Sequence, residues 1–207
     1  MEVVREIELC IIGPMDGVNG FVLAGGQSTR MGSDKAFVSL NGHTLLERAL
    51  QTVSSVASAV WILGSRDKFA TYGNVIEDEF PDHGPLGGIH AALRSSHEEL
   101  NVILAVDMPF VEARLLEYLV QRARGGVTVV TAPRSHRRWQ PLCAVYRRGF
   151  ADVAEPALRG GKNKIDPLFG QVSVQVVEES ELQEHGFGPE MFRNVNTPDE
   201  LSAAKLG

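Results

Sequence analysis

The chain has few cysteines, and that shortage narrows what it can be. Its 207 residues contain two cysteines, Cys10 and Cys143, which share no CxxC spacing. Two cysteines cannot supply a four-cysteine zinc site, and a domain of this size does not depend on a disulfide. We therefore expect two free thiols in a reducing compartment.

Long apolar runs and an excess of positive charge are also missing. The longest apolar stretch near the N-terminus, Leu9–Ile12, is far shorter than the roughly 20 residues of a membrane span. Nearby glutamates do not fit the charge pattern of a signal peptide. The formal net charge of -6 argues against a general nucleic-acid surface but still allows a local basic pocket. We expect a cytoplasmic protein that binds neither membrane nor nucleic acid.

Several catalytic patterns are absent as well. No pair among the six histidines has metal-ligand spacing, and no Ser/His/Asp arrangement can be proposed. The one glycine-rich loop that follows an apolar run contains neither Gly-Lys-Ser/Thr nor GxGxxG. A Walker A nucleotidase and a dinucleotide-binding Rossmann protein are therefore disfavoured.

Apolar runs that alternate with helical patterns predict an α/β fold. Strands are expected at 21–24, 60–63, 75–76, 102–106, 127–130, 142–146 and 172–177, and helices at 44–56, 91–93 and 115–123. This order predicts a single-domain, Rossmann-like, mostly parallel sheet with helices on both faces. Residues 1–17 form an N-terminal extension of unknown role, and residues 18–207 form the domain.

A glycine-rich loop, Leu23–Lys35, follows the first predicted strand of the domain. Its glycines let backbone N–H groups approach phosphate oxygens closely. Arg30 can bind a phosphate with two hydrogen bonds, and Lys35 adds a compact positive charge. Ligands of such sheets bind beyond the carboxyl ends of the strands, so the loop predicts a phosphate site. The alternative is a surface loop with incidental charges.

Asp107 follows five apolar residues and precedes Met-Pro-Phe. A carboxylate at a strand end is rigidly held, and Mg²⁺ takes one or two carboxylates together with substrate phosphates. The alternative is an N-cap for the helix that begins near Val111. Asp78 lies in an acidic run, and on residue chemistry alone it belongs to a solvated surface. On residue chemistry alone, Gly84–Gly88 is a turn that starts a helix.

These segments together resemble one family. LAGGxSxRMGxDK at Leu23–Lys35 is similar to the loop of the molybdenum cofactor guanylyltransferases, nucleotidyltransferases of the wider group that includes sugar-nucleotide pyrophosphorylases. Asp-Met-Pro-Phe, Ile-Glu-Asp, Gly-Pro-Leu-Gly-Gly and Asn-Val-Asn-Thr-Pro-Asp-Glu-Leu also resemble segments of that family, so the likeness runs from Val18 to Leu201. It implies a nucleotide-diphospho-sugar transferase-like fold and Mg²⁺-dependent transfer of GMP from GTP to the phosphate of molybdopterin, with release of pyrophosphate.

The resemblance also implies roles for individual residues. The implied catalytic residues are Arg30, Lys35 and Asp107, with Asp107 as metal ligand. The nucleotide-binding set is Leu23, Ala24, Gly25, Gly26, Lys35, Asp78, Gly84, Leu86, Gly88 and Asp107. The acceptor-binding set is Arg138, Gln140, Asn194 and Asn196. The implied partners are GTP and a molybdopterin-type cofactor. Whether cofactor-delivery proteins also bind the chain is left open.

One departure from the family leaves alternatives open. The family often has an asparagine at the end of its second strand, where this chain has Leu63 and Gly64. A nucleotidyltransferase that uses CTP or another small phosphorylated acceptor would share the loop and the aspartate. A non-catalytic GTP-binding adaptor would share them too, but would release no pyrophosphate.

Overall fold

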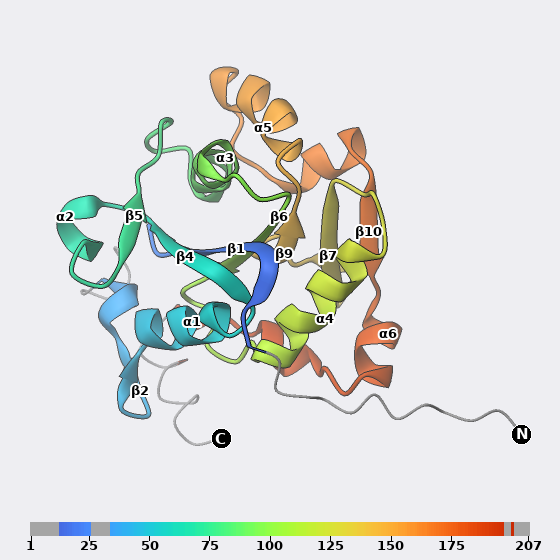
Figure 1. Cartoon of the computed structure of the whole chain (residues 1–207), viewed down its shortest axis with the longest axis horizontal. Coiled ribbons are helices and arrows are strands. Elements are labelled where there is room, and N and C mark those ends of the chain that lie inside the picture. Colours follow the sequence, from blue (N-terminus) through green and yellow to red (C-terminus); the bar gives the residue numbers. More distant parts are fainter. Residues whose placement is uncertain (1–12, 26–33, 197–199, 201–207) are drawn as a thin grey trace, which may run out of the picture.

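An eight-stranded mixed sheet forms the centre of the protein (Figure 1). The computed structural model describes residues 13–25, 34–196 and 200. The strand order is β10-β7-β9-β6-β1-β4-β5, with β8 paired to β7, and only β9 and β8 run antiparallel to their neighbours. The strands are β1 Met15–Leu23, β4 Ala57–Leu63, β5 Asn74–Ile76, β6 Leu100–Ala105, β7 Val130–Ser135, β8 Arg138–Trp139, β9 Cys143–Tyr146 and β10 Val174–Val177.

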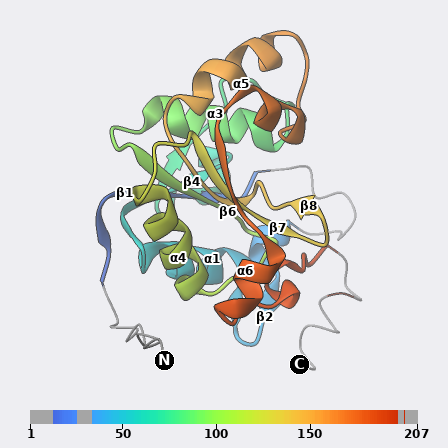
Figure 2. The same ribbon diagram turned by 90° about the vertical axis from the view of Figure 1, so that its right-hand side faces the viewer.

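Helices cover both faces of this sheet, as the sequence predicts. Helices α3 and α5 pack together on one face, and α1, α4 and α6 lie on the other (Figures 1 and 2). The short helix α2 lies beside the edge strand β5. Their bounds are α1 Leu45–Ser54, α2 Arg66–Phe69, α3 Pro85–Ser95, α4 Ala113–Arg124, α5 Phe150–Arg159 and α6 Glu179–Glu184. Within the described ranges, no helix combines the length and apolarity needed to cross a membrane.

The central strands end at the same level. In the parallel ladders Leu23 of β1 pairs with Leu63 of β4 on one side and Ala105 of β6 on the other. Ile76 of β5 pairs with Leu63 in turn. β6 is buried at every position, as expected for a strand covered on both faces. The segments that leave these strands therefore emerge side by side at one edge of the sheet.

The predicted start of the first helix is confirmed. Thr44 is the N-cap of α1, and its side chain accepts a hydrogen bond from the backbone N–H of Glu47, whose carboxylate accepts one from the Thr44 N–H. This capping box satisfies two N–H groups that the helix cannot satisfy itself. A small hairpin, formed by β2 Ser39–Leu40 and β3 His43–Thr44, follows Val38 and leads into α1. α1 therefore begins directly after this hairpin.

Three expectations need adjustment. The strand predicted at 127–130 is β7, Val130–Ser135, because Val127 is 92% exposed and lies in the connection from α4. Helix α5 was not predicted, since Pro156 lies inside it, although its apolar residues recur at helical spacing and are buried. β1 begins at Met15, so the predicted boundary between residues 17 and 18 falls within that strand.

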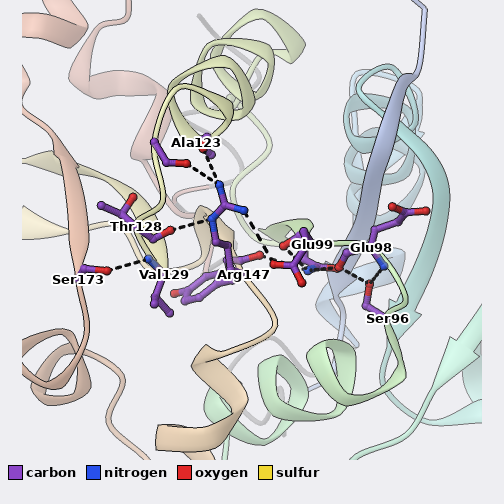
Figure 3. A network of polar contacts seen from close by, with 11 residues as sticks. Ser96, Glu98, Glu99, Ala123, Thr128, Val129, Arg147 and Ser173 are labelled. Carbon is purple, nitrogen blue, oxygen red and sulfur yellow. Dashed lines mark hydrogen bonds and ion pairs between the residues drawn. The ribbon is translucent and has the colours of Figure 1, made fainter.

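Arg147, just after β9, holds the end of α4 and the following loop (Figure 3). Its guanidinium donates hydrogen bonds to the carbonyl oxygens of Ala123, Gly126 and Thr128, at 3.0, 2.7 and 3.1 Å. It also lies 3.9 Å from a carboxylate oxygen of Glu99. A cation at a helix C-terminus is favourable because the last carbonyl groups carry partial negative charge. Arg147 therefore ties α4 to the antiparallel side of the sheet.

We expect Arg147→Met to lower the free energy of unfolding by about 2–3 kcal/mol, because it leaves several half-buried carbonyl groups without a charged donor. The measurement is equilibrium unfolding in urea. Arg148→Met is the matched control: Arg148 is an exposed neighbour with the same charge, and its loss is expected to change stability by no more than about 0.5 kcal/mol. Equal effects of the two substitutions would contradict this account.

Candidate functional site

The segments that follow the aligned strand ends contact one another through their backbones. The N–H groups of Ala24 and Gly25 both donate to the carbonyl oxygen of Leu63, at 3.0 and 2.9 Å. The N–H of Val106 donates to the carbonyl oxygen of Leu23 at 3.0 Å. A Cβ on Gly25 would lie 3.3 Å from the Cα of Gly64, so the two backbones approach closely. The first residues of the glycine-rich loop are thus held against the end of β4.

Lys35 and Asp107 form an ion pair at this edge. Lys35 opens the 3-10 helix η1 Lys35–Phe37, and its Nζ lies 3.5 Å from Oδ2 of Asp107. The exposed fractions of the two side chains are 23% and 21%. Burial raises the pKa of the Asp107 carboxyl above its usual range, and the Lys35 ammonium opposes that shift. The structure thus brings together the lysine that the sequence analysis assigned to phosphate and the aspartate that it assigned to Mg²⁺.

Asn196 completes this cluster from the far end of the chain. The Nζ of Lys35 donates a hydrogen bond to the amide oxygen of Asn196. The N–H of Val195 donates to the carbonyl oxygen of Asp107 at 2.9 Å, which fixes the segment beside the end of β6. The amide oxygen of Asn196 and the carboxylate of Asp107 therefore flank one ammonium group.

Two adjoining cavities lie over the strand ends. The larger has a volume of about 650 Å³, within the usual range for a small-molecule site. Its lining residues are Leu23, Ala24, Gly25, Asp34, Leu63, Gly64, Ser65, Lys68, Phe69, Asp78, Asp82, Gly84 and Gly88. The smaller, of about 150 Å³, is lined by Leu23, Ala24, Gly25, Asp34, Lys35, Pro85, Ala105, Val106, Asp107 and Leu142. Because they share the first loop residues and Asp34, the cavities form one continuous site.

Asp78 lies in the larger cavity against the first turn of α3. A Cβ on Gly88 would lie 3.4 Å from its Oδ1, and one on Gly87 3.1 Å from its Oδ2. Burial raises the pKa of Asp78 to about 6, from 3.8. On residue chemistry alone this aspartate belonged to a solvated run. The fold instead turns it into the site, because β5 ends beside β4.

The nucleotide set predicted from the sequence falls into three groups. Most of its members line one or both cavities: Leu23, Ala24, Gly25, Lys35, Asp78, Gly84, Gly88 and Asp107. Leu86 lines neither, because its side chain is fully buried in the core beneath α3. Gly26 and Arg30 lie outside the described residues. Neither cavity therefore supports the predicted nucleotide contact of Leu86.

Of the four predicted acceptor residues, Asn196 lies beside the Lys35–Asp107 pair. The other three do not line either cavity. Arg138 is exposed on the hairpin between β7 and β8, and Asn194 is exposed as well. Gln140 uses its backbone N–H to donate to Pro133. Arg134 stacks on the Trp139 ring, 4.3 Å from its centroid, and pairs with Glu178. None of these side chains lines either cavity.

Seven lining residues of the larger cavity are absent from the predicted nucleotide set: Asp34, Leu63, Gly64, Ser65, Lys68, Phe69 and Asp82. Ser65, Lys68 and Phe69 follow the end of β4. The rule that ligands lie beyond the carboxyl ends of strands applies to them as it does to Gly25 and Asp107. Asp34 precedes Lys35 directly and was overlooked beside it.

Comparison with known proteins gives a family for this arrangement. The family model of the MobA-like NTP transferase domain matches residues 20–173. The match includes the carboxyl ends of the central strands, the segments that carry Lys35 and Lys68, and Asp107. It ends before Asn196.

Curated relatives agree over most of the chain. The molybdenum cofactor guanylyltransferase of Desulfosudis oleivorans is 34% identical over 196 residues, covering 92% of this chain and 96% of the relative. The probable molybdenum cofactor guanylyltransferase of Carboxydothermus hydrogenoformans is 32% identical, covering 89% and 93%. The similarity is therefore not confined to the nucleotide loop.

Solved structures are similar as well. Molybdopterin-guanine dinucleotide biosynthesis protein A from Archaeoglobus fulgidus has a TM-score of 0.79 at 31% identity, covering 91% of this chain and 97% of that one. CMP:2-keto-3-deoxy-manno-octonic acid synthetase has a TM-score of 0.64 at 13% identity, covering 91% and 97%. The second likeness concerns the fold alone.

We expect Asp78→Asn to stabilise the protein at pH 8 but not at pH 4. The folded carboxyl keeps its proton up to about pH 6, whereas an unfolded one loses it near 3.8. Stability therefore falls as the pH rises between these values, and the cost remains above them. Removing the charge should add about 1 kcal/mol at pH 8, less than the full shift because solvent reaches the group. Thermal unfolding at both pH values checks this, and an equal effect at both would refute it.

Proposed function

This chain belongs to the MobA-like NTP transferase family, and from that premise we propose that it transfers GMP from GTP to the phosphate of a molybdopterin-type cofactor, releasing pyrophosphate. Relatives named for this activity match about nine tenths of the chain, and they support the choice of nucleotide and acceptor. The enzyme is a nucleotidyltransferase of molybdenum cofactor biosynthesis.

One observation carries the proposal: the Lys35 ammonium and the Asp107 carboxylate meet at the ends of β1 and β6, within the smaller cavity. That cavity continues into one large enough for a nucleoside. A cation and a carboxylate beside a nucleoside-sized space are the groups needed to bind a triphosphate and its divalent ion. The arrangement supports the reaction at the α-phosphorus in the smaller cavity, with the rest of the nucleotide extending into the larger.

The proposed reaction is a direct displacement at the α-phosphorus of GTP. An oxygen of the acceptor phosphate forms the new P–O bond, and the bond to the bridging oxygen of pyrophosphate breaks. The attacking phosphate is already ionised, so no general base is needed. Lys35, together with Arg30 of the glycine-rich loop, stabilises the charge that develops on the leaving pyrophosphate. The aligned loop and strand ends hold the reactants in place, which supplies much of the rate.

The residues around the Lys35–Asp107 ion pair are suited to hold Mg²⁺. The carboxylate of Asp107 and the amide oxygen of Asn196 are hard oxygen donors, which this ion prefers, and they lie on the same ammonium group. The buried carboxylate has its pKa raised despite Lys35, so its negative charge is incompletely balanced and favours a further cation. When bound, Mg²⁺ would neutralise phosphate oxygens and polarise the reacting phosphorus.

The acceptor is expected on the side of β8 and β9. Leu142, at the start of β9, lines the cavity that holds Asp107. Gln140 precedes it, and the Arg138 hairpin extends beyond it. Trp139, stacked by Arg134, offers a flat apolar surface next to a basic hairpin. These features suit a heterocycle that carries a phosphate, and they support Arg138 and Gln140 as acceptor contacts, while Asn194 stays a prediction.

The direct test is pyrophosphate release with each of the four ribonucleotides, with and without molybdopterin, in the presence of Mg²⁺. We expect release with GTP only when the acceptor is present. Release with CTP instead would identify a cytidylyl-transferring relative. Binding of GTP with no release under any condition would identify an adaptor and overturn the proposed activity.

We expect Asp107→Asn to lower kcat by at least about 100-fold, because the substitution removes the charge that holds the divalent ion while keeping the shape of the side chain. Glu184→Gln, an exposed substitution of the same kind on α6, is the matched control and should keep wild-type turnover. Steady-state pyrophosphate release measures both variants. Wild-type turnover by Asp107→Asn would refute the metal role.

A further inference from the structure

The charge in the larger cavity is unbalanced. Three carboxylates line it, those of Asp34, Asp78 and Asp82, and Lys68 is the one lysine or arginine among its described lining residues. A nucleoside triphosphate is strongly anionic, so a cavity with this inventory repels it unless cations lie close by. Lys35 supplies one in the smaller cavity. Lys68 is the corresponding candidate in the larger one.

Lys68 is held by Asp34, and its donors are not exhausted by that contact. Its Nζ lies 2.9 Å from Oδ2 of Asp34. An ammonium group has three N–H donors, so it can keep this contact and still donate to a phosphate oxygen. The exposed fraction of the Lys68 side chain is 55%, against 19% for Asp34. The carboxylate is therefore the fixed partner, and the lysine is accessible to a ligand.

Asp34 connects the two lysines. Its Oδ1 accepts a hydrogen bond from the N–H of Ala36 at 3.2 Å and caps η1, the helix that carries Lys35. Its Oδ2 accepts from Lys68. Asp34 also lines both cavities. One carboxylate thus sets the position of a cation on each side of it.

The helix that carries Lys68 is anchored in the core. Phe69 of α2 is 1% exposed, and its ring lies 5.7 Å from that of Phe37 at the end of η1. α2 and η1 therefore pack against each other through aromatic rings as well as through the ion pair. This packing places the base of the Lys68 side chain at a defined point of the cavity wall.

We propose that Lys68 is a second nucleotide-binding cation, which contacts the phosphate chain of the bound nucleoside triphosphate from the side opposite Lys35, with Asp34 as the positioning residue between them. The inference rests on the proposed function, because it needs a nucleotide in these cavities. It adds a contact from α2, which follows β4, to those from the glycine-rich loop and β6.

The test is binding of GTP with Mg²⁺ to the full chain by titration calorimetry, with guanosine measured by competition. We expect Lys68→Met to weaken GTP binding about tenfold, the effect of losing one charge-assisted hydrogen bond. Guanosine has no phosphate, so its affinity should not change. Lys68→Arg keeps the charge and should stay close to wild type. Arg148→Met removes one exposed positive charge at the opposite edge of the sheet and should bind GTP as wild type does.

Two results would overturn the inference. Unchanged GTP affinity in Lys68→Met would show that the lysine does not contact the nucleotide. An equal loss for GTP and guanosine, accompanied by a lower Tm, would show that the ion pair only tethers α2 to η1. The wild-type chain in the same series separates the two levels of the argument, because failure of the wild type to bind GTP would remove the proposed function itself.

Discussion

The parallel register of three strands determines where this protein can act. β4, β1 and β6 end level with one another, at Leu63, Leu23 and Ala105. The hydrogen bonds between neighbouring strands fix their relative register, so the loops that leave these strands must share one edge of the sheet. Residues 72 positions apart, Lys35 and Asp107, therefore meet at that edge. Asp78 joins them because β5 continues the same level on the other side of β4.

The fold accepts unfavourable electrostatics at this edge. Burial raises the pKa of Asp78 and of Asp107, so keeping either carboxylate ionised costs free energy in the absence of a cation or ligand. The Asp34 and Asp107 carboxylates hold lysines that a triphosphate also attracts. Such a cluster is less stable by itself than an apolar one. In the proposed function, an anionic nucleotide and a divalent ion would offset this cost, which is the usual relation between stability and function at a site.

Apolar runs, cap residues and strand-end rules were enough to predict the sheet, the start of α1 and the positions of the glycine-rich loop and Asp107 at strand ends. They could not predict contacts that depend on how two irregular segments approach in space. The ion pair of Lys68 with Asp34 joins a helix of four residues to a 3-10 turn, and neither has a strong sequence pattern. Leu86 shows a second limit. A motif match cannot distinguish a residue that lines a cavity from one whose side chain is buried in the core.

The two ends of the site are built differently, and this affects how their specificity can change. The nucleotide end consists of strand termini, so altering it disturbs the sheet. The proposed acceptor end includes the hairpin whose turn, at His136 and Arg137, has positive φ, and whose strand β8 pairs with β7 at the side of the main sheet. Substitutions there leave the core ladders intact. Under the proposed assignment, acceptor choice would therefore depend on residues that the sheet itself does not constrain.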